Sequence, residues 1–383
     1  MKAVARLLPH SPPPLPSPPH RSNYYSPQNP NPKLAHLSFP FNPSSYAAAA
    51  AAAAVPRALS SAGAAEQEKP IVVVGSANAD IYVEIDRLPR PGETVAASRG
   101  RTLAGGKGAN QACCGGRLAP GNPTYLVGRV GDDAHGRLIE DALRGGGVRL
   151  DRLARVGAAP SGHAVVMLQP DGQNSIIIVG GANMSGWPRE PRREDLDLVR
   201  GAGILLLQRE IPDWVNAQVA QEAKGAGVPV IMDAGGVDTP IPKELFGFVD
   251  IFSPNETELA RLTGMPTETF EQISQAAVKC HEMGFKQVLV KLGSNGSALF
   301  VEGEEPIQQP VIPAAKVVDT TGAGDTFTAA FAVALVEGKP MKECLRFAAA
   351  AASLCVQVKG AIPSMPDRKS VVELLQSPAL ETI

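Results

Sequence analysis

A glycine-containing stretch near the C-terminal end, D-T-T-G-A-G-D at 319–325, has the residue types that phosphoryl transfer needs. The G-A-G at 322–324 lets backbone N–H groups approach a ligand without side-chain obstruction, and an apolar helix is predicted to begin near Thr326. A helix N-terminus offers free N–H donors and the positive end of the helix dipole, which suits a transferring phosphate. Asp325 is therefore the candidate proton acceptor; an N-cap alone would need neither G-A-G nor D-T-T.

A second glycine cluster, T-L-A-G-G-K-G-A-N-Q-A at 102–112, also precedes a predicted helix. It is not a Walker A loop, because Lys107 is followed by Gly108 rather than by Ser or Thr. Lys107 and Asn110 offer hydrogen-bond donors to hydroxyl groups, and the neighbouring glycines permit close backbone approach. An ordinary glycine-rich turn remains an alternative.

A third candidate, G-S-A-N-A-D at 75–80, directly follows an apolar run. Asn78 and Asp80 alternate along an extended backbone, so both side chains point to one face, where an amide and a carboxylate could bind adjacent sugar hydroxyls. A turn stabilised by its own side chains would explain the same residues.

Two further polar segments follow predicted strands: P-N-E-T-E at 254–258 and K-L-G-S-N-G at 291–296. Glu258, early in a helix, could hold hydrated Mg²⁺ through water, since Mg²⁺ commonly keeps several waters. An acid favoured by the helix dipole is the alternative for Glu258. The residues at 292–296 would form a turn that contacts a nucleotide.

These segments follow short apolar, β-branched runs that are separated by helix-length stretches. The runs lie at 71–75, 125–128, 204–207, 228–233, 250–253 and 288–291. Strands alternating with helices predict an α/β fold, a three-layer sandwich with a central mainly parallel sheet covered by helices on both faces. Ligands in such sheets bind at the carboxyl ends of the strands, where the polar segments stand.

Two segments interrupt this alternation, at 81–97 and 163–179, and both are predicted to be extended. The second is predicted to be a hairpin that turns at Asp171 and Gly172. We expect a small inserted β-sheet, from about 81–104 and 163–180, that acts as a lid. The whole domain, lid strands included, would span 66–383.

The first 65 residues contain five Lys or Arg, no Asp or Glu, and much Ser, Pro and Ala. This composition cannot build a packed core and matches an organellar transit peptide, with a cytosolic disordered tail as the alternative. Ser and Pro dominate and no Arg-rich amphipathic helix is evident, which favours chloroplast over mitochondrion.

The rest of the chain carries 31 basic against 38 acidic residues, which gives a formal charge of -7 and no basic surplus for nucleic acid. No segment is apolar for ~20 residues, so a membrane protein is not expected. The five cysteines show no C-x-x-C spacing and are expected to be reduced, mostly buried thiols.

Taken in order, G-S-A-N-A-D, R-P-G-E-T, G-G-K-G-A-N-Q-A, P-N-E-T-E, K-L-G-S-N-G and D-T-T-G-A-G-D-T-F resemble the ribokinase family of carbohydrate kinases over residues 70–366. The resemblance implies transfer of the γ-phosphoryl group of ATP to the 5-hydroxyl of D-ribose. It also implies a requirement for Mg²⁺, activation by K⁺, and a homodimer formed through the lid sheet.

The resemblance also implies the roles of individual residues. It makes Asp325 the catalytic base and Gly322, Ala323 and Gly324 the anion hole. Ribose would be bound by Asn78, Ala79, Asp80, Gly106, Lys107, Gly108, Ala109, Asn110 and Glu210, together with Asp325. ATP would be contacted by Asn255, Lys291, Leu292, Gly293, Ser294, Asn295, Gly296, Gly324 and Asp325. Potassium would be held by Asp319, Thr321, Cys355, Val358, Gly360 and Ser364, and Mg²⁺ by Glu258 through water.

The chain departs from the family pattern at a few positions. Lys291 replaces a threonine that often precedes L-G-S, and Arg209 beside Glu210 is unusual. The alternatives are a kinase for another small sugar or nucleoside, such as fructose or adenosine, and a catalytically silent plastid member that serves as a sugar sensor or assembly factor. A Rossmann dehydrogenase is not expected, because the first strand leads into G-S-A-N-A-D rather than G-x-G-x-x-G.

Overall fold

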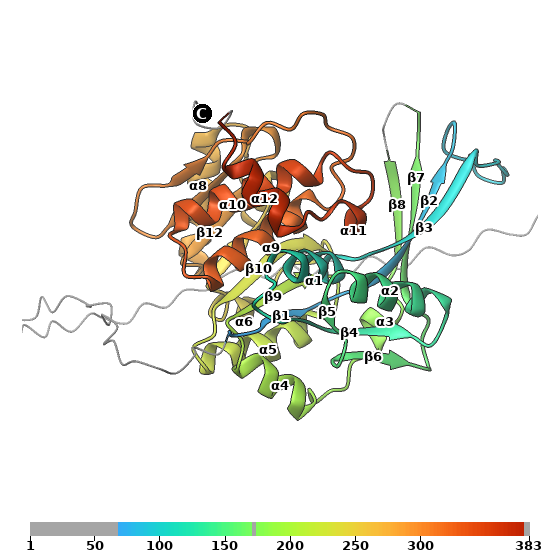
Figure 1. Cartoon of the computed structure of the whole chain (residues 1–383), viewed down its shortest axis with the longest axis horizontal. Coiled ribbons are helices and arrows are strands. Elements are labelled where there is room, and N and C mark those ends of the chain that lie inside the picture. Colours follow the sequence, from blue (N-terminus) through green and yellow to red (C-terminus); the bar gives the residue numbers. More distant parts are fainter. Residues whose placement is uncertain (1–67, 171–173, 379–383) are drawn as a thin grey trace, which may run out of the picture. The chain divides into compact units, whose positions relative to one another are not determined.

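The computed structural model describes residues 68–170 and 174–378 (Figure 1). The predicted transit peptide at 1–65 and the predicted turn at Asp171 and Gly172 lie outside these ranges. Within them, none of the helices combines the length and the apolar character needed to cross a membrane.

The central sheet has ten strands and is mainly parallel. In the order β14-β13-β12-β11-β10-β9-β1-β4-β5, with β6 also paired to β4, all strands from β12 to β5 run parallel, and β13 and β14 add an antiparallel edge. All six predicted strands are confirmed. The bounds are β1 Ile71–Val74, β4 Thr124–Gly131, β5 Val148–Arg149, β6 Leu153–Val156, β9 Ile204–Arg209, β10 Val230–Gly236, β11 Ile251–Ser253, β12 Gln287–Lys291, β13 Ser297–Val301 and β14 Ile307–Gln309.

Helices cover both faces of this sheet, as predicted for a three-layer α/β fold. Alternation along β1 sends Ile71 and Val73 into one buried cluster and Val72 and Val74 into the other. The first cluster includes α1 Lys107–Leu118, α2 Ala134–Gly145, α9 Ala323–Val336, α10 Met341–Cys355, α11 Ala361–Ser364 and α12 Arg368–Leu375. The second includes α4 Arg193–Arg200, α5 Asp213–Gly225, α6 Lys243–Phe246, α7 Glu256–Thr263 and α8 Phe270–Met283. All five cysteines are free and buried, as expected.

A separate four-stranded sheet, here called the lid sheet, has the order β3-β2-β7-β8 and extends from the main body in Figure 1. Its strands are β2 Asn78–Glu84, β3 Arg99–Gly105, β7 Gly162–Leu168 and β8 Asn174–Val179. The inserted sheet is therefore confirmed, but the predicted strand at 81–97 is wrong at both ends. Strand β2 already begins at Asn78, and 85–98 is a loop, because Pro89 and Pro91 supply no N–H donor to a ladder.

Candidate active site

A cavity of about 720 Å³ lies between one face of the lid sheet and the carboxyl end of the central sheet. Strand β2 contributes every second side chain, Asn78, Asp80, Tyr82 and Glu84, which is the alternation expected of a strand with one face toward a ligand. Six of the nine residues predicted to bind the sugar, apart from Asp325, line this cavity: Asn78, Asp80, Gly106, Lys107, Asn110 and Glu210.

The other three residues predicted for the sugar, Ala79, Gly108 and Ala109, are not on the cavity wall. Ala79 is buried on the opposite face of β2 because neighbouring strand residues alternate. The Ala109 N–H donates to the Ser76 carbonyl at 2.8 Å. A Cβ on Gly108 would stand only 2.6 Å from the Ser76 backbone nitrogen, so these two residues serve to pack α1 against the end of β1.

The position of Asp80 explains why residue 105, before α1, is a glycine. Antiparallel pairing of β2 with β3 places Asn78 opposite Gly105 and Asp80 opposite Leu103. A Cβ on Gly105 would overlap the Asp80 Oδ2. Glycine at 105 thus leaves the space into which the Asp80 carboxylate turns, so the two sugar segments form one unit.

Glu210 fixes the start of α1 from the end of β9. Its Oε2 accepts hydrogen bonds from the Ser76 hydroxyl at 2.6 Å and from the Lys107 backbone N–H at 3.0 Å. A carboxylate at the first residue of a helix is also favoured by the helix dipole. Glu210 therefore joins the carboxyl ends of β1 and β9 to the N-terminus of α1.

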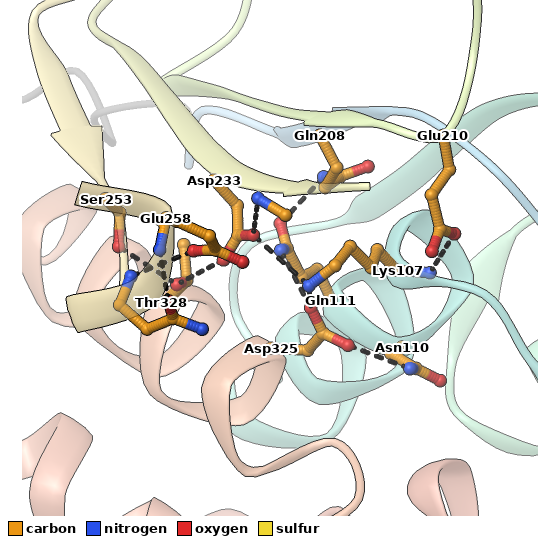
Figure 2. A network of polar contacts seen from close by, with 12 residues as sticks. Lys107, Asn110, Gln111, Gln208, Glu210, Asp233, Ser253, Glu258, Asp325 and Thr328 are labelled. Atoms are coloured by element: carbon orange, nitrogen blue, oxygen red, sulfur yellow. Dashed lines mark hydrogen bonds and ion pairs between the residues drawn. The ribbon is translucent and has the colours of Figure 1, made fainter. Parts of the chain in front are cut away.

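Asp325 is the third residue of α9 and lies just behind the cavity wall, with only 5% of its surface exposed. Its Oδ2 accepts from Asn110 Nδ2 at 2.9 Å and its Oδ1 from Gln111 Nε2 at 3.2 Å. The Lys107 ammonium stands 3.5 Å from Oδ1 (Figure 2). Gln111 is itself held by Gln208, so two buried amides and an ammonium fix the orientation of the carboxylate.

The turn before Asp325 has the form expected of an anion site, with one difference. Gly322 adopts φ +80°, and a Cβ there would stand 3.1 Å from Ala361. The Ala323 N–H, predicted to face the phosphate, donates instead to the Thr320 carbonyl at 3.1 Å. Among the described residues, no hydrogen-bond acceptor is found for the N–H groups of Gly322, Gly324 and Asp325, which leaves three donors for an anion.

The electrostatics of the cavity divide its charged groups into two kinds. Burial, together with the negative charges of Glu210 and Asp325, raises the pKa of Asp80 to about 7. Burial alone would lower the pKa of Lys107, but the carboxylates of Asp233 and Asp325 outweigh it and hold that pKa well above its usual value. Lys107 thus remains a cation at neutral pH, whereas Asp80 is poised between its neutral and ionised forms.

Seven of the nine residues predicted for ATP, all but Gly324 and Asp325 of α9, lie at the ends of β11 and β12, outside the cavity wall. Asn255 caps α7 and pairs with Lys291 in a parallel bridge. The single-turn helix η1 Gly293–Asn295 follows β12, and the Leu292 N–H closes the turn on the Gly296 carbonyl at 2.8 Å. Leu292 is only 6% exposed, so its side chain belongs to the core and only its backbone faces this edge.

Glu258 forms a capping box with Asn255. The Asn255 N–H donates to Glu258 Oε2 and the Glu258 N–H donates to Asn255 Oδ1, both at 2.8 Å. In the part of the chain that the structure describes, no group of three or more His, Cys, Asp or Glu side chains could hold a metal ion directly. The single carboxylate of Glu258 therefore fits Mg²⁺ only if the ion keeps most of its water shell.

Five of the six residues predicted for potassium, all but Val358, come together where 318–321 meets 355–364. Asp319 Oδ1 accepts from the Thr321 N–H at 2.9 Å and Oδ2 from the Gly360 N–H at 2.8 Å. The Cys355 thiol contacts the Ser364 hydroxyl at 3.0 Å and approaches the Thr321 carbonyl at 4.0 Å. The site offers carbonyl and hydroxyl oxygens beside one carboxylate, and carbonyl oxygens are the ligands that replace the hydration shell of K⁺ in potassium channels.

Several residues of this site were not singled out from the sequence. Gln111 and Asp233 contact charged groups of the site. The Ser76 hydroxyl donates to Glu210, and Asn183 holds the Ala77 backbone and the Asn78 amide. Gln111 belongs to the glycine cluster and Asp233 ends a predicted strand, so their positions offered a signal. Asn183 offered none, because α3 (Ala182–Ser185) is brought to β2 only by the tertiary fold.

The unusual Arg209 has a structural explanation. It is 1% exposed, pairs with Asp213 at 2.7 Å, and donates to the Thr239 carbonyl at 2.7 Å. Its guanidinium also contacts the carbonyls of Val237 and Pro240. Arg209 therefore holds the loop after β10 and contacts none of the cavity.

Comparison with known proteins points to one family. Residues 68–368 match the model of the pfkB family carbohydrate kinases. A ribokinase of Arabidopsis thaliana is 73% identical over 309 residues, which are 80% of this chain and 81% of that protein. A ribokinase of Bacillus subtilis is 38% identical over 305 residues, 80% of this chain and 99% of that protein. The structure of Arabidopsis thaliana ribokinase complexed with ribose and ATP superimposes with a TM-score of 0.78 and 72% identity, covering 81% of this chain and 99% of that one.

Proposed function

The chain belongs to the pfkB family of carbohydrate kinases, and on that premise we propose that it transfers the γ-phosphoryl group of ATP to the 5-hydroxyl of D-ribose. The observation that carries this proposal is the position of Asp325, buried behind a polar cavity at the N-terminus of α9 and next to unpaired backbone donors. The ribose and ATP complex of the similar Arabidopsis protein supports the choice of substrates.

In this proposal the sugar hydroxyl is bound in the cavity beside Asn110 and Lys107. Its oxygen forms a bond to the γ-phosphorus while the bond to the β–γ bridging oxygen of ATP breaks, and its proton passes to Asp325. The transition state is loose, so positioning and charge stabilisation dominate. The N–H groups of Gly322, Gly324 and Asp325 and the helix dipole would stabilise the negative charge on the migrating group.

The direct test replaces Asp325 by Asn, which keeps the shape of the side chain and removes the proton acceptor. General-base assistance is worth ~10² to 10⁴ in rate, so turnover is expected to fall by at least ~10²-fold. Equilibrium binding of ATP and ribose is expected to persist, which separates loss of chemistry from loss of the fold. Near-normal turnover would remove Asp325 from the mechanism.

The proposal extends to two cations. Mg²⁺, held through water by Glu258, would neutralise the phosphates, and K⁺ in the loops of Asp319 and Gly360 would order the turn that carries the N–H donors. Asp319 supports the second role because its carboxylate already contacts both loops. Activity that is unchanged when a bulky organic cation replaces potassium would contradict it.

Substrate selectivity is the part of the proposal that most needs a direct assay. ATP consumption is measured with D-ribose, fructose and adenosine, each with and without potassium. We expect the highest kcat/KM with ribose. A preference for fructose or adenosine would favour another kinase of the same family, and no turnover with any of them would favour a catalytically silent member.

We also propose that the lid sheet closes over the bound sugar and forms the contact between two copies of the chain. Closure would exclude water and suppress hydrolysis of ATP. Support for the dimer comes from β8, an edge strand on which Ile176, Ile177, Ile178 and Val179 are all more than 40% exposed. Exposed apolar edge strands are covered in most soluble proteins.

For the first 65 residues we propose a plastid transit peptide. Support comes from the five basic residues, the lack of acidic residues and the abundance of Ser and Pro in this stretch. A fluorescent protein fused behind these residues is expected to enter chloroplasts of plant cells. Cytosolic or mitochondrial fluorescence would contradict the assignment.

A further inference from the structure

A buried carboxylate with no role in the mechanism above lies at the centre of the polar network in Figure 2. Asp233 ends the regular part of β10, where the register with β9 shifts between Met232 and Gly236. Its surface is 0% exposed. A charge taken completely out of water is costly unless it is paired and hydrogen-bonded, so the contacts of Asp233 need an explanation.

Asp233 accepts hydrogen bonds on both oxygens. Oδ2 lies 2.5 Å from Lys291 Nζ and 3.3 Å from the Thr328 hydroxyl. Oδ1 lies 3.2 Å from Lys107 Nζ and 2.9 Å from the Gly235 N–H. Burial alone would raise the pKa of Asp233, but the two lysine charges outweigh burial and hold it well below its usual range. The carboxylate is thus an anion shared by two cations.

The two lysines come from opposite sides of the site. Lys107 begins α1 on the cavity wall, and its ammonium is only 3.5 Å from Asp325. Lys291 ends β12 on the nucleotide side, and its Nζ is 4.0 Å from the point where a Cβ would stand on Gly324. Asp233 is therefore the one described carboxylate that pairs with both lysines, between the predicted sugar and phosphate positions.

The alternative partner of Lys107 is Asp325. The ammonium is almost equally close to both carboxylates, at 3.2 Å from Asp233 and 3.5 Å from Asp325. Without the negative charge of Asp233, Lys107 would pair with Asp325 alone. A carboxylate whose lone pairs are taken by an ammonium group is a weaker acceptor for the proton of a sugar hydroxyl.

We propose that Asp233 is a positioning residue for phosphoryl transfer, which holds Lys107 and Lys291 at fixed places and keeps the Lys107 ammonium from pairing with Asp325 alone. This inference rests on the proposed function, since it assumes that Asp325 accepts the proton. It also explains Lys291, which stands where related kinases often carry threonine: the lysine is matched by a buried partner of opposite charge. Asp233 itself touches neither substrate.

The test compares Asp233→Asn with the wild-type full-length chain. Asparagine has nearly the same volume and keeps an oxygen that accepts from lysine, but it lacks the charge. We expect kcat with ribose to fall about tenfold to 10²-fold. Equilibrium binding of ATP is expected to keep its stoichiometry and to become unchanged or several-fold tighter, because two uncompensated lysines then face the triphosphate.

A structural role for Asp233 predicts the opposite pattern, since a damaged site binds ATP more weakly or with reduced stoichiometry. That result, or an unchanged kcat, would overturn the inference. Asp233→Ser is a second variant with the same expected signs, and failure of both to fold would make the carboxylate structural and also overturn it.

Asp195→Asn is the matched control: Asp195 is 3% exposed, pairs with Arg192 far from the cavity, and should lose thermal stability without a change in kcat or ATP affinity.

The kcat measurement and the ATP-binding measurement together separate a failure of this inference from a failure of the proposed function. If the wild-type chain does not phosphorylate ribose, the proposed function fails, and the direction of the ATP affinity change still decides whether Asp233 neutralises the lysines. If the wild type is active and Asp233→Asn binds ATP more weakly, the function stands and the positioning role fails.

Discussion

Asp80 combines two properties that make it a reporter of sugar binding. Its side chain lines the cavity, and burial with two neighbouring carboxylates raises its pKa to about 7. An ionised carboxylate accepts hydrogen bonds on both oxygens, whereas the protonated form loses part of that capacity. In the proposed function, the protonation state of Asp80 would therefore control how well adjacent sugar hydroxyls are held.

This property gives a pH prediction. As pH rises from about 6 to about 8, Asp80 ionises and the KM for ribose is expected to fall. The pKa of Asp80 is raised in the folded protein, so the unfolded chain loses this proton at a lower pH than the folded chain does. The free energy of unfolding is therefore expected to fall as pH rises from 3.8, the ordinary pKa of an aspartate, to about 7. Steady-state assays across this range check the first effect. Asp80→Asn should flatten the profile, and a wild-type KM that does not vary with pH would contradict the assignment.

Gly105 offers a second test at the level of single residues. A Cβ at this position would overlap the Asp80 carboxylate, so Gly105→Ala must displace it from the cavity wall. Overpacking of this kind costs about 1–3 kcal/mol, and we expect the KM for ribose to rise at least ~10-fold. Gly145→Ala is the control, because a Cβ there meets nothing within 4 Å. Equal effects of both substitutions would show that Asp80 is not held by this contact.

Single residues were predictable from the sequence where chemistry and position coincided. Asp325 and Lys107 stand beside glycines and lie at the site, whereas Glu210, which lies there too, was predicted only through the family resemblance. Asp233 also follows an apolar run, but its significance depends on two lysines that lie far from it in the chain. Such pairings are set by packing of distant elements and leave no local pattern.

Among the elements, α7 and α8 provide a matched pair, since both begin with a complete capping box. In α7 the third-position acid is Glu258, the proposed holder of hydrated Mg²⁺, whereas in α8 the corresponding residue is Gln272. The two helix starts share their geometry and differ in charge. A comparison between them can therefore separate capping from metal binding.

We predict that Glu258→Gln keeps the capping hydrogen bond and changes stability by less than about 0.5 kcal/mol. The Mg²⁺ concentration for half-maximal activity should rise about threefold or more, because the negative charge is lost. Thr269→Ala, which removes the cap of α8, should cost about 1 kcal/mol of stability and leave the Mg²⁺ dependence unchanged. Thermal unfolding and magnesium titrations measure the two effects. An unchanged magnesium requirement in Glu258→Gln would leave only the capping role.

Six of the ten strands of the main sheet were predicted, because buried parallel strands give short, uniformly apolar runs with glycine or polar residues at their ends. The strands β5, β6, β13 and β14 were not predicted. The lid sheet was harder. Its strand β2 starts inside the polar G-S-A-N-A-D segment, where the side chains facing the cavity are an amide and a carboxylate. Polar residues on a ligand-facing strand hide the alternation by which half-buried strands are recognised.

At the scale of the whole molecule, the lid edge tests the dimer. Ile177 is 56% exposed and, unlike Ile176 and Ile178, does not line the cavity. Ile177→Lys is expected to shift sedimentation from dimer to monomer at micromolar concentration, because a buried unpaired charge opposes association. Val278→Lys is the control, since Val278 is 57% exposed on α8. A wild-type chain that sediments as a monomer would contradict the dimer.

The sequence predicted that helices cover both faces of the sheet, but it did not predict which helix lies against which face. Alternation along β1 predicts that both faces of the sheet are covered, and two buried clusters confirm it. Which helix lies against which face depends on crossover connections, and α1 and α9 meet at the site although about two hundred residues separate them. The convergence of Asn110 with Asp325 is a property of the assembled fold.

Because β2 belongs to the lid sheet and also carries Asn78 and Asp80, the proposed closure and the proposed contacts to the sugar would be coupled through one strand. A molecule too large for the cavity would displace β2 outward and weaken its own contacts with Asn78 and Asp80. A smaller molecule would allow the lid sheet to close. Selectivity for the size of the substrate would then follow from how far the lid sheet can close over it.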